Sequence, residues 1–189
     1  IAMSPVTEFT TDGLPVFIIK DIPPASVEGA PTVDNPQIYF GEATDDWVIV
    51  GSKTPDFDHP STDGAVYKSY SGPGIFLNSF LRKLIFAINF GDLNLLITSE
   101  VTPESQILYY RSIAERVKRV APFLDLDSDP YIVSSEDGQL YWIQDAYTTS
   151  DRYPYSEPDG METTSVNYIR NSAKIVVNAY DGSMEFFIT

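Results

Sequence analysis

Residues 131–147, "YIVSSEDGQLYWIQDAY", decide how the C-terminal half of the chain is expected to fold. The runs "YIVSS" and "QLYWIQDAY" are typical of strands, and the "EDG" between them is typical of a tight turn. A second hairpin is predicted further on, because "AKIVVNAY" and "SMEFFIT" flank "DG" at Asp181 and Gly182. Since hairpins pair their strands antiparallel, we expect a mostly antiparallel sheet. A one-residue slip in the second hairpin would expose Ile175 and Val177 together.

The two hairpins share a short pattern where a strand is expected to end. "IQDAY" and "VNAY" each place Asp or Asn before Ala and Tyr. We expect Asp145 and Asn178 to bond to local backbone there. Tyr147 should be largely buried on the helical layer, with its hydroxyl hydrogen-bonded. This repeated device favours a structural role for the stretch.

Between the N-terminal strands and these hairpins, the spacing of apolar residues changes to that of helices. Residues 75–90 repeat apolar side chains every four positions, which predicts an amphipathic helix with a broad buried face. Gly91 is placed to end this helix and Asp92 to cap the next element. A second helix is predicted from Thr102, with Pro103 at its first position, to near Pro122 in its last turn.

The N-terminal part is richer in loops. We predict a strand at residues 16–20, a loop at 21–36, a hairpin formed by "PQIYFGE" and "DWVIVGS", and a loop at 53–64. The order of strands, two helices and strands predicts an α+β fold: a mostly antiparallel sheet with two central helices packed on one side. We expect residues 1–189 to form a single domain with a loop-rich lead-in at 1–36.

Composition excludes several classes of function. The formal net charge of −15 repels phosphate backbones and argues against nucleic acid as a partner. The chain has no cysteine, which excludes disulfides and thiol chemistry. The sequence contains neither a signal peptide nor a membrane span. Because it begins at Ile1 and ends in "MEFFIT", we expect the natural protein to be longer.

Charge is unevenly distributed along the chain. Residues 75–121 carry six basic and four acidic side chains, a net charge of +2, which leaves −17 for the remainder. The helical layer is therefore mildly basic. It could face anionic lipid or an acidic domain of the parent protein, or it could simply present two solvated helix faces.

Residues 141–158 mix aromatic and polar side chains in the way that ligand sites do. The candidate ligand-binding residues are Trp142, Asp145, Asp151, Arg152, Tyr153 and Tyr155. Such a surface could hold a protein, peptide or glycan ligand. The alternative, which we favour, is that Arg152 pairs with a nearby Asp and the tyrosines cover the core.

Metal binding has one candidate segment, "DLDSDPYIVSSE". Its acids have much of the spacing of a calcium loop, and the candidate ligands are Asp125, Asp127, Asp129 and Glu136. Pro130 stands where that loop needs Gly, and a strand follows where it needs a helix. We therefore expect no cofactor and keep Ca²⁺ as a minor alternative. The only histidine, His59, is expected to be exposed and idle in a polar loop.

Long segments of the chain resemble a known family. They are "FLRKLIFAINFGDLNLLITS", "PFLDLDSDPYIV", "YWIQDAYTTSDRYPYS" and "NYIRNSAKIVVNAYDG", with "GLPVFIIKDIPP" and "PQIYFGE" in support. They resemble the soluble region of uncharacterised protein family 0182, large bacterial multi-pass membrane proteins. The resemblance implies N-terminal membrane helices followed by a large extracytoplasmic portion that includes this segment. It supplies no catalytic residues.

The expected function follows from that resemblance and from the missing catalytic motifs. We expect a non-enzymatic extracytoplasmic domain that acts in binding, sensing or assembly, with other domains or membrane helices of the parent protein as partners. The alternative is a carboxylate-based hydrolase domain, possibly dependent on Ca²⁺.

Overall fold

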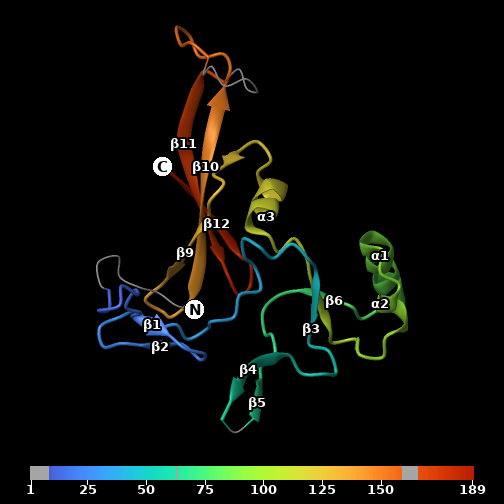
Figure 1. Ribbon diagram of the computed structural model, residues 1–189. Helices are drawn as coiled ribbons and strands as arrows, with labels where there is room; N and C mark the ends of the chain where they lie inside the picture. Colours follow the sequence, from blue (N-terminus) through green and yellow to red (C-terminus); the bar gives the residue numbers. More distant parts are fainter. Residues whose placement is uncertain (1–8, 63, 159–165) are drawn as a thin grey trace. The chain divides into compact units, whose positions relative to one another are not determined.

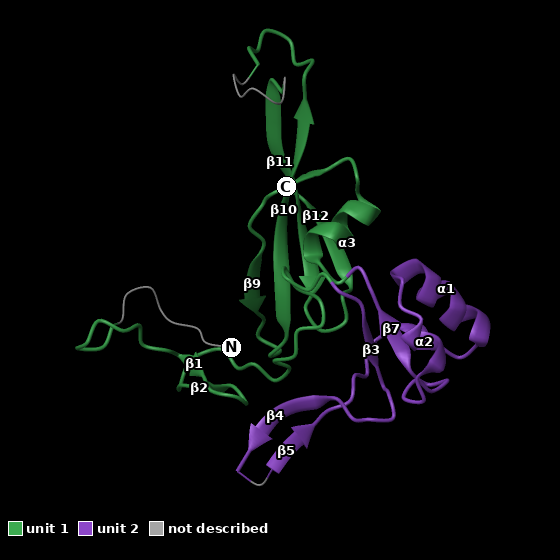
Figure 2. Cartoon of the chain, turned by 45° about the vertical axis from the view of Figure 1, so that its right-hand side comes forward, with its two compact units in different colours: residues 1–45, 111–189 green, residues 46–110 purple. Residues whose placement is uncertain are grey.

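The computed structural model describes residues 9–62, 64–158 and 166–189. The chain divides into two compact units, residues 1–45 with 111–189 and residues 46–110 (Figure 2). The sheets are antiparallel and carry helices beside them, which confirms the α+β class. The described residues contain three helices rather than two. We predicted that residues 1–189 fold as a single domain. The division into two compact units does not test whether they fold together, so this stays a prediction.

Unit 1 is built on a five-stranded sheet. Its central strands, β10 (Leu140–Ser150) and β11 (Tyr168–Asn178), run side by side as a long antiparallel hairpin (Figure 1). β12 (Met184–Ile188) pairs with the outer side of β11. β8 (Asp125–Leu126) and β9 (Tyr131–Ser134) both pair with β10. Both predicted hairpins are confirmed. However, β10 does not end at Tyr147 but continues to Ser150 beyond a bulge.

The two faces of this sheet differ. Gln144, Ala146, Ile175 and Val177 point to one face and are fully buried. The helix α3 (Ile113–Val120) contacts β10. Its residues Ile113 and Val117 are fully buried. Two short strands, β1 (Ile19–Lys20) and β2 (Ala25–Ser26), form a separate ribbon. The predicted strand at 16–20 is therefore shorter, and the predicted loop at 21–36 contains β2.

The helix α3 corrects the second helix prediction. It begins at Ile113 after Ser112, whereas we predicted a start at Thr102. Residues 102–105 form a turn, and residues 106–108 form the strand β7 (Gln106–Leu108). Ile107 and Leu108 are almost fully buried. A run of three residues is too short to distinguish the spacing of a helix from that of a strand. Residues 106–108 form a strand because they pair with β3 and β6.

Unit 2 contains a three-stranded sheet with β7 at its centre, between β3 (Val48–Val50) and β6 (Ile75–Phe76). The predicted hairpin between residues 36–42 and 46–52 is wrong, because β3 pairs with β7. The segment before it belongs to unit 1, where the Tyr39 N–H donates to the Ala179 carbonyl over 2.9 Å. The predicted loop at 53–64 is also wrong, since β4 (Phe57–Ser61) pairs with β5 (Gly64–Tyr67).

The helix α1 (Phe80–Phe90) is shorter than the predicted 75–90. Ile75 and Phe76 pair with β7 instead, and Ser79 caps the helix by accepting the Arg82 N–H. The predicted end is confirmed, because Gly91 adopts a φ of 69° as the C-cap. The Asp92 carboxylate accepts the N–H of Asn94, the first residue of α2 (Asn94–Ile97), over 2.9 Å.

Candidate functional site

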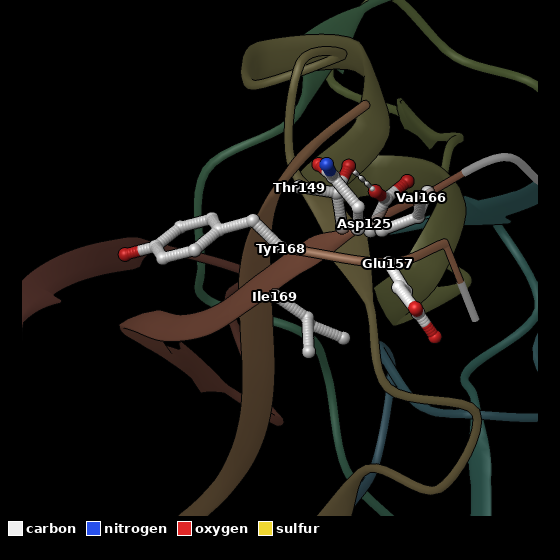
Figure 3. A pocket seen from close by; sticks show the side chains of 7 residues that line it. Asp125, Thr149, Glu157, Val166, Tyr168 and Ile169 are labelled. Atoms are coloured by element: carbon white, nitrogen blue, oxygen red, sulfur yellow. Dashed lines mark hydrogen bonds between the residues drawn. The ribbon is translucent and has the colours of Figure 1, made fainter. Parts of the chain in front are cut away.

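A cavity of about 460 Å³ lies beside the outer half of the β10–β11 hairpin. Figure 3 shows its lining, with Asp125 from β8, Thr149 from β10 and Tyr168 from β11. The Thr149 hydroxyl donates to the Asp125 carboxylate over 2.6 Å. The remaining lining residues are Glu157, Val166, Asn167 and Ile169. The cavity therefore combines two carboxylates with amide, hydroxyl and apolar groups.

Asn167 holds the loop that forms one side of this cavity. Its amide nitrogen donates to the carbonyls of Tyr153 and Ser156, at 2.9 and 3.2 Å. Its amide oxygen accepts the Tyr153 N–H over 2.9 Å. The Tyr153 ring stacks on Tyr168, with the ring centroids 4.7 Å apart. These contacts tie residues 153–156 to the start of β11.

A second polar group lies further along the hairpin. The Asp145 carboxylate accepts from the Lys174 ammonium over 2.5 Å and from the Asn171 amide over 2.9 Å. The hydrogen bond from Lys174, followed by that from Asn171, lowers the pKa of Asp145, and the same bond raises the pKa of Lys174. A general acid at neutral pH needs a raised pKa, so Asp145 is suited to pairing rather than to proton donation.

Tyr147 only partly follows its prediction. Its hydroxyl is hydrogen-bonded as expected, because it donates to Asp127 over 2.8 Å. That bond raises the pKa of Tyr147. The side chain is mostly covered and keeps some exposure to solvent. It lies on the sheet face opposite Gln144 and Ala146, which explains its exposure.

The candidate ligand residues are not brought together. Trp142 packs in the core cluster with Leu140 and Ala179, at the end of β10 away from the 151–158 loop. Asp151 and Arg152 form the predicted ion pair, 3.6 Å apart, and both are exposed. Tyr155 is fully exposed. Among the six candidates, Tyr153 is the one whose ring stacks on a described residue of the cavity lining, Tyr168.

The candidate calcium ligands are likewise dispersed. Asp125 accepts from Thr149, and Asp127 accepts from Tyr147 and from the Asp129 N–H. Glu136 lies in the β9–β10 turn. Within the described residues, no group of three or more carboxylates or imidazoles is arranged to hold a metal ion.

His59 also differs from its prediction. It lies in β4 with only 15% of its side chain exposed, and its Nδ1 is 3.1 Å from the Asp58 carboxylate. Nearby, burial raises the pKa of Asp56, although a hydrogen bond from the Gly51 backbone opposes this effect. The described carboxylates thus give no support to the hydrolase alternative.

Sequence reasoning missed a second cavity, of about 410 Å³, on the open face of the five-stranded sheet. Tyr141 and Ile143 of β10, Val176 of β11 and Phe187 of β12 contribute to it. Burial, followed by the charge of Asp137, raises the pKa of Tyr141. The signal was present in "LYWI", where Leu140 and Trp142 alternate with Tyr141 and Ile143, so that both faces of the strand carry apolar or aromatic side chains.

The comparisons with known proteins agree with the resemblance noted in the sequence. The Uncharacterised protein family (UPF0182) matches residues 1–189, the whole chain. The chain belongs to the UPF0182 family. UPF0182 proteins of Desulforamulus reducens and Geobacter sulfurreducens are 50% and 47% identical to it over 190 residues each. A UPF0182 protein of Methanospirillum hungatei is 48% identical over 189 residues.

The UPF0182 relatives are much longer than this chain. The chain is covered completely by the first relative but spans only 20% of it. The names of these relatives state no activity. No solved structure matches the chain significantly. In the part of the chain that the structure describes, no helix has the length and apolar character needed to cross a membrane.

Proposed function

We propose that this chain is a non-enzymatic extracytoplasmic domain of a longer multi-pass membrane protein. Among binding, sensing and assembly, assembly is the role that the geometry favours. The size of the relatives supports this proposal, because about four-fifths of their length lies outside the segment that matches this chain. That remainder offers partners within the same polypeptide.

The single observation that carries an assembly role is the open edge of β12. Within the described residues, β12 pairs only with β11. Phe186, Phe187 and Ile188 are 41%, 49% and 92% exposed. Edge strands are commonly protected by lysine, proline or a bulge, but Glu185 is the only charged residue in β12. An apolar edge of this kind is a template for another strand.

The hydrogen-bond register identifies the groups available to that strand. The Asn178 N–H donates to the Ser183 carbonyl, and the Thr189 N–H donates to the Ser172 carbonyl. Ser183 and Thr189 thus direct their backbone groups toward β11, and alternation along the strand directs those of Phe186 away from it. An incoming strand would bond to the backbone of Phe186.

Cross-linking in the full-length protein tests this assembly role. A photoreactive benzoyl-phenylalanine at position 188, now the exposed Ile188, is expected to cross-link to another segment of the same polypeptide. Phe186→Pro removes the outward N–H and should reduce that product about tenfold, while Phe186→Ala keeps the N–H and most of the product. Equal yields in both variants, or no cross-link in the parent, would contradict the role.

The extracytoplasmic location has its own test, in which a thiol is introduced into this cysteine-free segment. Arg152→Cys places a thiol at a side chain that is 89% exposed. Intact cells that produce the full-length variant should be labelled by a membrane-impermeant maleimide, and cells that produce the parent protein supply the background. Labelling that appears only after the cells are permeabilised would place the segment in the cytoplasm.

A further inference from the structure

The helix α1 is apolar around most of its circumference. Its polar residues are Arg82, Lys83 and Asn89. One side of α1 packs on the core of unit 2, where Ala87 is fully buried together with Leu77. Phe86 and Phe90 stack beside them, with ring centroids 5.7 Å apart. The side of α1 that carries Ala87, Phe86 and Phe90 is therefore the side that packs against the core of unit 2.

The other side of α1 presents large hydrocarbon side chains to solvent. They continue onto α2, which packs against α1 (Figure 2). We call this surface the α1–α2 apolar face, and its members are Phe80, Leu81, Ile85, Ile88, Leu93 and Ile97, each between 55% and 80% exposed. Leu81, Ile85 and Ile88 form one stripe along α1 at helical spacing. Exposed apolar side chains gathered on two helices that pack together are typical of a protein or membrane contact.

Charge distinguishes this part of the chain from the rest. Residues 64–97, which include the whole α1–α2 apolar face, contain the basic residues Lys68, Arg82 and Lys83 and one acidic residue, Asp92, in a chain of net charge −15. The Arg82 guanidinium donates to the Phe76 carbonyl and the Lys83 ammonium to the Val101 carbonyl, each over 3.1 Å. These bonds hold two cations at the first turns of α1. The segment that carries the apolar face therefore has a small positive balance, with the exposed Arg82 at the start of α1, whereas the Lys83 ammonium is directed to the core residue Val101.

We infer that the α1–α2 apolar face inserts into the headgroup region of a bilayer that contains anionic phospholipid. This inference rests on the proposed place of the domain beside a membrane and names the surface that meets it. Interfacial helices combine Phe and Leu on one side with Lys and Arg at the border. The six side chains carry no hydrogen-bonding group, whereas protein interfaces concentrate their binding energy in Trp, Tyr and Arg. A lipid surface needs neither shape nor hydrogen-bond complementarity.

Vesicle binding by the purified chain is the first test. The chain should co-sediment with vesicles of phosphatidylglycerol and phosphatidylcholine and bind pure phosphatidylcholine at least tenfold more weakly. Ile85→Asp combined with Ile88→Asp should weaken binding at least tenfold. Both positions are exposed, so circular dichroism should show an unchanged fold. Ile169→Asp is the matched control, because Ile169 is 64% exposed on β11 and lies in the other unit.

The second test measures insertion directly. Since the chain has no cysteine, a spin label on Ile88→Cys reports from one position only. On the anionic vesicles, the label should become more accessible to oxygen and less accessible to a water-soluble nickel relaxant. The same label on Ile169→Cys should remain in water.

Three results would overturn the inference: no vesicle binding, equal weakening by the α1 and Ile169 variants, or a label on Ile88→Cys that stays in water. Sedimentation that instead shows self-association lost in the α1 variant would assign the face to a second copy. These measurements use vesicles and the isolated chain. Their failure is therefore distinct from failure of the maleimide test, which reports only the side of the membrane.

Discussion

Asp145 and Lys174 face each other across β10 and β11. Because the folded protein lowers the pKa of Asp145, the ionised carboxylate stabilises the fold above the unfolded value of 3.8. That contribution is lost as the pH falls through the lower folded value. Lys174 has the opposite sign: its raised pKa contributes stability below the unfolded value of 10.5, which is lost as the pH rises through the folded value.

We predict that Asp145→Asn destabilises the protein at neutral pH and that the difference from the parent disappears in acid, as the pH falls through the lowered folded pKa of Asp145. Urea denaturation across that range measures it. Asp151→Asn is the control, because its exposed pair with Arg152 should change the unfolding free energy by no more than about 0.5 kcal/mol. A difference for Asp145→Asn that persists unchanged in acid would show that its charge is not responsible.

Gly182 supports a second prediction at the residue scale. It has a φ of 71°, and a Cβ placed there would lie 2.8 Å from the Phe40 ring. Gly182→Ala should therefore cost more than about 1 kcal/mol of unfolding free energy. Gly91 has a φ of 69° with nothing within 4 Å, so Gly91→Ala pays the backbone cost alone. Equal losses in calorimetry would exclude a contribution from Phe40.

At the scale of single elements, β11 allows a comparison within one strand. Ile175 is fully buried, whereas Ile169 is 64% exposed. Ile175→Ala should cost about 2–5 kcal/mol through lost burial and a residual cavity. Ile169→Ala should cost no more than about 0.5 kcal/mol. Chemical denaturation of both variants checks the register, since similar losses would mean that the strand is shifted.

The hairpins were predictable because turn residues and alternation agree there. "EDG" and "DG" supply Gly138 and Gly182, both with positive φ. Around them, alternate residues such as Ile175 and Val177 are buried. Local and tertiary preferences therefore indicate the same structure.

The start of α1 was not predictable from the same kind of signal. Ile75 and Phe76 extend the helical spacing, yet they pair with β7, a strand more than 25 positions away. The face of α1 expected to be buried is the exposed one, because periodicity identifies an apolar stripe without identifying what covers it. The dispersal of the candidate ligand residues has a related reason. Trp142 and Tyr155 belong to one aromatic stretch of the sequence, but Trp142 lies near the start of β10 and Tyr155 lies beyond its end.

For the whole molecule, the prediction of a single domain can be tested by unfolding. Val48 pairs with Leu108, so folding of unit 2 brings its two ends together and lowers the entropy cost of joining the two parts of unit 1. We therefore expect one cooperative transition, which both Leu77→Ala in unit 2 and Ile175→Ala in unit 1 shift to lower denaturant. Two separate transitions, each sensitive to only one of these variants, would contradict the prediction.

The contact between residues 39–41 and 111–113 also sets an order of events during synthesis. The Arg111 side chain donates to the Tyr39 carbonyl, 72 positions earlier in the chain. At translation rates of about 5–20 residues per second, the ribosome makes Arg111 roughly 4–14 s after Tyr39. Unit 2 is continuous in sequence and emerges entirely within that interval, so it can fold first. β12 emerges after β11, and until then the edge of β11 that β12 covers is open to chaperones.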